Sequence, residues 1–155
     1  MTDLRAIVGL YEHCDSTLEE LRHVAEAAGD ENNRAHIEHR QTINDQAYFV
    51  LAWGQLEVAI DEACRDAIRV GQEHSDWRYR RAWGMYNPDD RRLSGLRFQD
   101  RLSLVLDQET DEWRKAMHHY GIRNQVAHGR LRSERIDVSS VIEDFYVVES
   151  SLSRD

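Results

Sequence analysis

The sequence predicts an all-α protein, an up-and-down bundle of five or six helices that residues 1–155 form as a single domain. The chain has 155 residues, with one proline and eight glycines, so few residues resist helical dihedral angles. Apolar residues recur at alternating spacings of three and four, which is typical of amphipathic helices, and no stretch has a convincing strand pattern. This length suits one hydrophobic core.

Two long helices are predicted in the first half of the chain. An apolar stripe over residues 4–28 predicts the first, and Gly29 is expected to end it. The second is expected to follow a short polar turn and to run to about Val70, with Gly71 at its end. Because residues 47–60 are apolar on more than one side, we expect this helix to be the central buried helix of the bundle.

Residues 74–86 combine four aromatic residues with three arginines. The spacing of Tyr79, Trp83 and Tyr86 predicts a helix face packed on a core, and stacking on the bases of single-stranded RNA is the alternative. Two arginines of this stretch are predicted to contact an RNA backbone: Arg78 and Arg81.

Three further segments complete the predicted chain. Residues 87–95 begin with a turn sequence and are expected to form a mobile loop, followed by a shorter helix over residues 96–108. Thr110 is predicted to cap the start of the next helix, and Gly129 to end it. Asp137 is predicted to cap a last helix, whose apolar stripe either completes the core or forms a dimer face.

The net charge of −9 argues at first against a nucleic-acid ligand, because an acidic surface repels a polyanion. The distribution of charge weakens this objection. Residues 77–135 carry a net charge of +5, whereas residues 1–76 carry −10 and residues 136–155 carry −4. The basic excess therefore lies in the part of the chain that holds the candidate site.

The sequence also indicates a cellular compartment. Cys14 and Cys64 fall inside helical patterns and form no paired motif, which favours reduced cytoplasmic thiols over a disulfide or a metal site. Residues 1–6 do not begin a signal peptide, and no stretch approaches membrane-spanning length. We therefore expect a soluble cytoplasmic protein without a membrane partner or a bound metal.

The candidate site is the stretch from Tyr120 to Gly129. Arg123 offers a planar set of donors that suits a phosphate, and His128 can transfer a proton near neutral pH. In a helix, Asn124 and His128 lie at positions i and i+4, with Arg123 to one side. A site that needs both Arg and His on one phosphate is built more easily from two copies that face each other across a twofold axis.

This stretch resembles the Arg-x4-6-His motif of the HEPN superfamily, which contains small all-α proteins, many of them metal-independent endoribonucleases that work as dimers. Arg123 and His128 match the Arg and His of the motif, and Asn124 matches the polar residue that commonly follows the Arg. In one toxin branch, a tyrosine two residues after the His is modified by a partner nucleotidyltransferase. Arg130 occupies that position here, so the resemblance implies no such modification.

The resemblance implies an RNA substrate, a homodimer, and cleavage by the ribose 2′-hydroxyl without a metal or other cofactor. In this hypothesis His128 transfers the proton, Arg123 stabilises charge on the phosphoryl oxygens and Asn124 orients phosphate or imidazole. The resemblance also implies a role as a toxin with an antitoxin protein, in phage defence or in RNA processing. Three arginines after the motif are candidates for contacts with the RNA backbone: Arg130, Arg132 and Arg135.

Two alternatives to the endoribonuclease remain at this point. One is a noncatalytic HEPN-like helical module that binds a partner protein or a nucleotide, and the other is a purely structural bundle. In the first alternative the motif residues serve as structural or ligand contacts. In a purely structural role Arg123 forms a salt bridge, Asn124 a hydrogen bond, and His128 interacts with a helix C-terminus.

Overall fold

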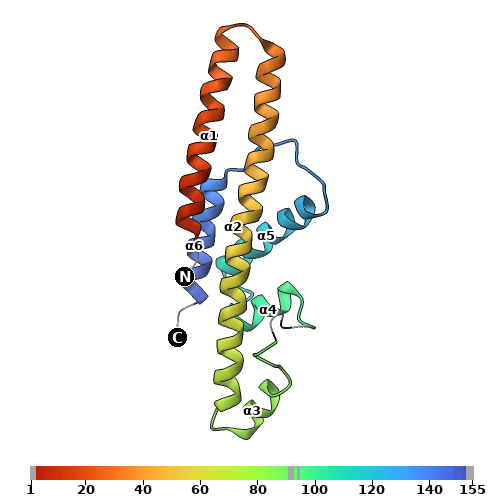
Figure 1. Ribbon diagram of the computed structural model, residues 1–155. Helices are drawn as coiled ribbons and strands as arrows, with labels where there is room; N and C mark the ends of the chain where they lie inside the picture. The colour runs from red at the N-terminus through yellow and green to blue at the C-terminus, as the bar shows by residue number, and fades with distance from the viewer. Residues whose placement is uncertain (1–2, 91–92, 94, 153–155) are drawn as a thin grey trace. The chain divides into compact units, whose positions relative to one another are not determined.

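The computed structural model describes residues 3–90, 93 and 95–152. In this part of the chain there are six helices and no strands (Figure 1). The all-α class and the expected number of helices are therefore confirmed for the described residues. The helices are α1 (Leu4–Ala27), α2 (Glu31–Glu73), α3 (Trp77–Trp83), α4 (Phe98–Val105), α5 (Asp111–Ala127) and α6 (Val138–Leu152).

The chain divides into two compact units. The first, called the motif unit, comprises Met1–Gln55 and His119–Glu143. The second, called the α3 unit, comprises Leu56–His118 and Asp144–Asp155. The boundary falls inside α2, α5 and α6, so each of these helices contributes residues to both units.

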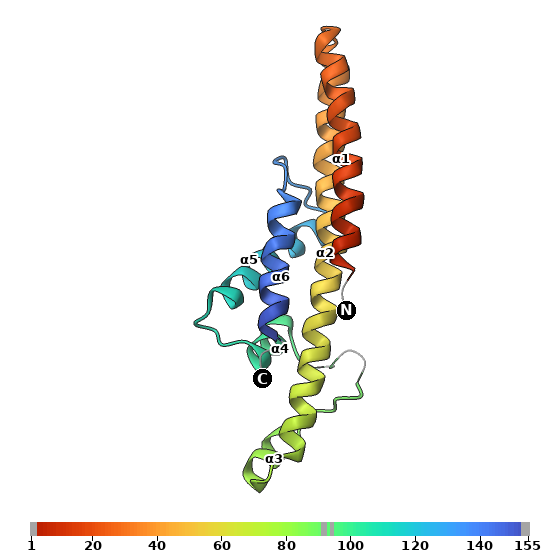
Figure 2. The ribbon, with the colours of Figure 1, turned by 90° about the vertical axis from the view of Figure 1, so that its left-hand side faces the viewer.

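In the motif unit, α1 and the part of α2 up to Gln55 lie side by side and run in opposite directions (Figures 1 and 2). Gly29 joins them with a φ of 67°, a conformation that glycine adopts without a steric penalty. Its N–H donates to the carbonyl of Glu26 at 3.0 Å, and the N–H of Asp30 donates to the carbonyl of Ala25 at 3.0 Å. These bonds form a Schellman motif, so the predicted helix end at Gly29 is confirmed.

Residues 47–60 are apolar on more than one side, but the expectation that these sides are all buried is wrong. The helix buries one face, and Leu51 on another face is 50% exposed. Val50 and Val58 are exposed as well. The apolar residues of α1 and α2 that are buried in the motif unit are Leu4, Ile7, Tyr11, Ala25, Ile37, Phe49, Ala52 and Trp53.

In the α3 unit, α2 continues past Gly71 to Glu73, so Gly71 does not end the helix as predicted. A Cβ atom at this position would lie 2.2 Å from Cγ of Trp83. Glycine is therefore needed here because the indole ring occupies the place of a side chain. Nε2 of Gln72 donates to the carbonyls of Trp83 at 3.1 Å and Tyr86 at 2.8 Å, which holds the end of α3 and the following turn on α2.

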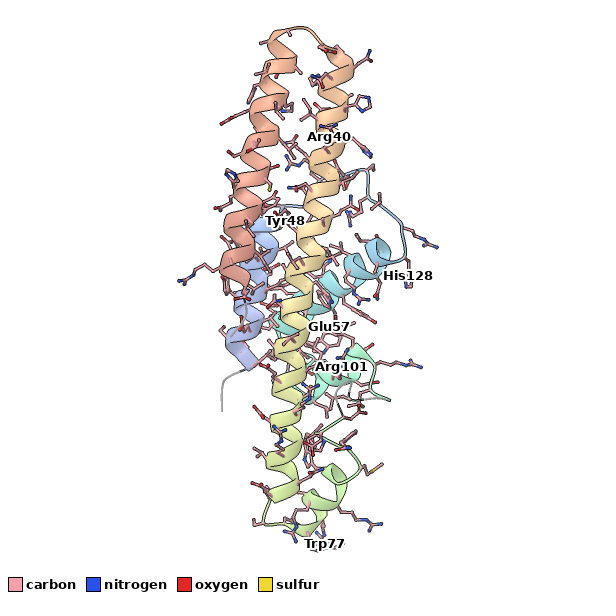
Figure 3. All side chains as sticks on the ribbon, in the orientation of Figure 1. Arg40, Tyr48, Glu57, Trp77, Arg101 and His128 are labelled. Carbon is pink, nitrogen blue, oxygen red and sulfur yellow. The ribbon has the colours of Figure 1, made fainter. Side chains whose placement is uncertain are left out.

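The helix α4 packs on α2 through Arg101, whose guanidinium group contacts the carboxylates of Asp61 and Glu57 (Figure 3). Sγ of Cys64 donates to the carbonyl of Arg101 at 3.0 Å. Burial raises the pKa of the Cys64 thiol to about 12. The predicted mobile loop at residues 87–95 includes residues 91, 92 and 94, which lie outside the described residues.

The helices α5 and α6 begin directly after their predicted N-cap residues, Thr110 and Asp137. Oγ1 of Thr110 accepts from the N–H of Trp113 at 3.3 Å, and Oδ1 of Asp137 accepts from the N–H of Ser140 at 3.1 Å. The apolar stripe of α6 completes the core, because four of its residues are buried in the chain: Val138, Val141, Phe145 and Val148. None of the helices in the described ranges combines the length and apolar character needed to cross a membrane.

Candidate functional site

The motif lies at the C-terminal end of α5, which aromatic rings hold against α2 within the motif unit. The ring of His119 lies 6.3 Å from that of Phe49, and the ring of Tyr120 lies 6.0 Å from that of Trp53. His119 and Phe49 are both buried. The residues just before the motif are therefore fixed by packing, which positions the last two turns of α5.

Arg123 and Asn124 form a hydrogen-bonded pair on this part of α5. Nη1 of Arg123 donates to Oδ1 of Asn124 at 3.2 Å. The sequence predicted that Arg123 lies to one side of the row that Asn124 and His128 share, and in the structure its guanidinium group reaches the adjacent Asn124 amide. Both residues are half-buried. Because the Asn124 oxygen accepts from the guanidinium, its amide nitrogen is the group that can donate to a phosphate.

His128 follows the last residue of α5, and its backbone N–H donates to the carbonyl of Asn124 at 3.1 Å. The i to i+4 relation predicted for these two residues is confirmed by this bond. Gly129, with a φ of 74°, ends the helix in a second Schellman motif. The residue His128 is exposed at the end of α5, where solvent and ligands can reach the imidazole ring (Figure 3).

A buried glutamine positions the segment after the motif. Oε1 of Gln46 accepts from the N–H of Arg132 at 3.0 Å, and Nε2 of Gln46 donates to the carbonyl of Arg132 at 3.2 Å. The Gln46 side chain thus binds both polar groups of one main-chain residue, as a neighbouring β-strand would. The segment is therefore held through the main chain of Arg132, and these two bonds do not involve the Arg132 side chain.

A buried ion pair holds the same segment a few residues further on. Asp45 is 0% exposed, and its carboxylate accepts from Nε of Arg135 at 2.8 Å and from Nη2 at 2.9 Å. It also accepts from the Tyr11 hydroxyl at 3.1 Å and from the N–H of Ile136 at 3.3 Å. The structure therefore gives Arg135 a structural role, in contrast to its expected role in RNA contact. Burial and the nearby Asp45 carboxylate raise the pKa of Tyr11 above its usual range.

Arg130 and Arg132 line an open hollow of about 300 Å³ next to the motif. Gln125 of α5 lies on one side of it, and Glu134 contributes an acidic group whose Oε2 is 3.6 Å from Nη2 of Arg132. The hollow does not include Arg123, Asn124 or His128. It adjoins them through the chain, because Gln125 directly follows Asn124 and Arg130 comes two residues after His128. The complete lining is Gln125, Arg130, Leu131, Arg132, Ser133 and Glu134.

The other two predicted RNA-binding residues, Arg78 and Arg81, belong to the α3 unit. Both are exposed on α3. The guanidinium carbon of Arg78 lies 6.0 Å from the centre of the Trp77 ring, which is a cation–π geometry.

Sequence reasoning did not identify Asp45 and Gln46 as residues that position the site. In the sequence they belong to a polar stretch that also contains Gln41, Thr42 and Asn44, so no local signal shows that they are buried and have distant partners. Across the described residues, no group of three or more His, Cys, Asp or Glu side chains is arranged to hold a metal ion. No protein-family model matches the chain, and no curated protein or solved structure matches it.

Proposed function

We propose that the chain is a metal-independent endoribonuclease of the HEPN type. The observation that carries this proposal is the arrangement at the end of α5. There, a guanidinium group is hydrogen-bonded to an adjacent amide, and an exposed histidine follows less than two turns later. These three groups supply a phosphate-binding fork, a further donor and a group that can transfer a proton.

In the proposed reaction, the ribose 2′-hydroxyl oxygen attacks the adjacent phosphorus atom. The bond from phosphorus to the 5′-oxygen breaks, which leaves a 2′,3′-cyclic phosphate and a 5′-hydroxyl. His128 transfers the proton, either from the attacking hydroxyl or to the leaving oxygen. Arg123 stabilises the charge that develops on the phosphoryl oxygens, and Asn124 orients the phosphate or the imidazole.

The segment after the motif supports RNA binding in this proposal. Arg130 and Arg132 line the open hollow, and Gln46 and Asp45 fix the main chain that carries them. RNA phosphates that flank the cleaved bond would lie along these two arginines. A homodimer would bring two such motifs to one RNA strand, and an antitoxin protein would block them if the enzyme is a toxin.

The test incubates wild-type protein with a labelled single-stranded RNA in excess chelator and reads both cleavage and end chemistry. His128→Ala and Arg123→Ala are each expected to lower the cleavage rate by about 10²-fold or more, as for other positioned proton-transfer and charge-stabilising groups. His118→Ala is the matched control, because this exposed histidine precedes the motif on the same helix. Equal cleavage by wild type and by His128→Ala would refute the proposed role of His128.

A second candidate function is a noncatalytic module that binds a nucleotide or a partner protein. The observation that favours it is the hollow, whose volume of about 300 Å³ is at the lower end for ligand pockets and whose lining lacks the three motif residues. Cleavage by the wild type separates the two functions, and Arg132→Ala tests whether a bound nucleotide occupies the hollow. No cleavage by wild type, together with nucleotide binding that this substitution abolishes, would favour the second candidate.

A further inference from the structure

The surface of α3 exposes aromatic rings although its backbone is held firmly. The helix has no buried residue, and Trp77 and Tyr79 are 57% and 58% exposed. The predicted packing role is confirmed for Trp83, which lies against Gly71, and it is wrong for Tyr79. Gln72 fixes the carbonyl groups at the end of the helix. The exposed rings are therefore presented by an ordered element.

Positive charge accompanies these rings. Residues 74–86 contain three arginines and one acidic residue, Asp76, in a chain whose net charge is −9. The guanidinium of Arg80 donates to the carbonyls of His74 at 2.7 Å and Ser75 at 2.8 Å, which fixes the turn before α3. Arg78 and Arg81 are exposed on the helix. The patch is thus complementary in charge to a polyanion, unlike the chain as a whole.

Two of the rings already stack. The His74 and Tyr79 rings have centroids 4.7 Å apart and an interplanar angle of 28°. The exposed Trp77 ring has the Arg78 guanidinium carbon 6.0 Å from its centre. Stacked aromatic rings interleaved with guanidinium groups are how proteins hold unpaired bases, since every base has a π-face that can continue the stack.

We propose that residues 74–86 form a platform for single-stranded nucleic acid, on which Trp77 and Tyr79 stack with unpaired bases while Arg78 and Arg81 contact phosphates. This inference rests on the proposed function for the identity of the polymer as RNA. The platform residues belong to the α3 unit and the motif residues to the motif unit. RNA binding by the platform and cleavage at His128 can therefore be measured with separate substitutions.

The test measures affinity for a short labelled oligouridylate in the His128→Ala background, in which cleavage is expected to be slower by about 10²-fold or more. Trp77→Ala and Tyr79→Ala are each expected to weaken binding by about tenfold or more, the effect of losing one stacked base. Trp77→Phe should stay near the starting affinity, whereas Trp77→Leu should behave like Trp77→Ala, because leucine keeps apolar surface without a ring. Val70→Ala is the control, since Val70 is a highly exposed apolar residue near the end of α2.

Further arms identify the ligand. Duplex RNA should bind more weakly than the single strand, because paired bases are not available for stacking. An oligothymidylate bound with the same dependence on Trp77 would support the platform and extend it to single strands of either sugar. Oligouridylate binding unchanged by Trp77→Ala and Tyr79→Ala would overturn the inference. So would a dependence on Trp77 seen only with anionic lipid vesicles or with an acidic peptide.

These results separate the two proposals. Loss of binding in the platform variants, with no cleavage by wild type, would retain the platform and refute the nuclease. Cleavage that depends on His128, with binding unchanged in the platform variants, would retain the nuclease and refute the platform.

Discussion

Two glycines inside α2 are expected to respond in opposite ways to the same substitution. Replacing glycine by alanine in a helix interior usually stabilises by about 0.5–1 kcal/mol, because alanine loses less backbone entropy on folding. A Cβ atom at Gly54 would meet nothing within 4 Å. Gly54→Ala should therefore raise the free energy of unfolding by about that amount.

At Gly71 the same Cβ atom would lie 2.2 Å from Cγ and 2.4 Å from Cδ1 and Cδ2 of Trp83. Carbon atoms in contact are about 3.5–4.0 Å apart, so the indole must move by more than about 1 Å. Rotation about χ2 leaves Cγ in place, and relief therefore requires a new χ1 rotamer or a shift of α3. Overpacking of this kind costs about 1–3 kcal/mol, and loss of a Gln72 hydrogen bond adds about 1 kcal/mol. Gly71→Ala should therefore lower the free energy of unfolding by about 1–3 kcal/mol after the helix gain is subtracted.

Urea unfolding followed by far-ultraviolet circular dichroism measures both changes. Gly71→Ala combined with Trp83→Ala provides the check on mechanism, because removal of the indole removes the overlap. In the Trp83→Ala background, Gly71→Ala should become neutral or stabilising. Stabilisation of the otherwise unchanged protein by Gly71→Ala, to the same extent as by Gly54→Ala, would show that Trp83 does not pack on α2 as described.

Three further predictions concern ionisable groups. Arg135→Ala leaves the buried Asp45 carboxylate without its main partner and should lower the free energy of unfolding by about 3 kcal/mol or more. The double variant Asp45→Asn plus Arg135→Ala should lose less stability than the sum of the two single variants. Urea unfolding measures all three values. Burial that raises the pKa of Cys64 to about 12 should make its alkylation near pH 8 much slower in the folded protein than in urea, as read by mass spectrometry. The hydrogen bond from Arg22 lowers the pKa of Glu19 from 4.5 to about 2, so its stabilising contribution is complete above pH 4.5 and is lost as the pH falls toward 2. Glu19→Gln should flatten the pH dependence of unfolding in that window, and an unchanged slope would contradict the assignment.

Features that depend on neighbouring residues could be predicted from the sequence. Thr110 and Asp137 accept hydrogen bonds from N–H groups three residues ahead, and Gly29 and Gly129 adopt positive φ at helix ends. Each of these features depends only on residues within about one helical turn, so the sequence around it is enough to predict it. The i to i+4 relation of the motif residues is local in the same way.

Features that depend on distant residues could not be predicted in this way. Glycine is typical of helix ends, but Gly71 is needed because the ring of Trp83, twelve positions further along the chain, packs against it. Arg135 reads as a solvated cation until Asp45 is placed beside it, 90 positions away in the sequence. In both cases a contact with a distant residue determines the role of the side chain or glycine. The spacing of apolar residues in the sequence does not indicate that contact.

The two hydrogen bonds between Gln46 and the main chain of Arg132 separate the support of this segment from the charge that its side chain brings to the hollow. The segment is held through its peptide groups, so any residue at position 132 that keeps a backbone N–H can form the same two bonds with Gln46. The charge beside the hollow can therefore change by substitution while the support remains the same. Variation at this position would alter ligand preference at little cost to folding, which makes Arg132 a natural point of divergence among proteins built on this scaffold.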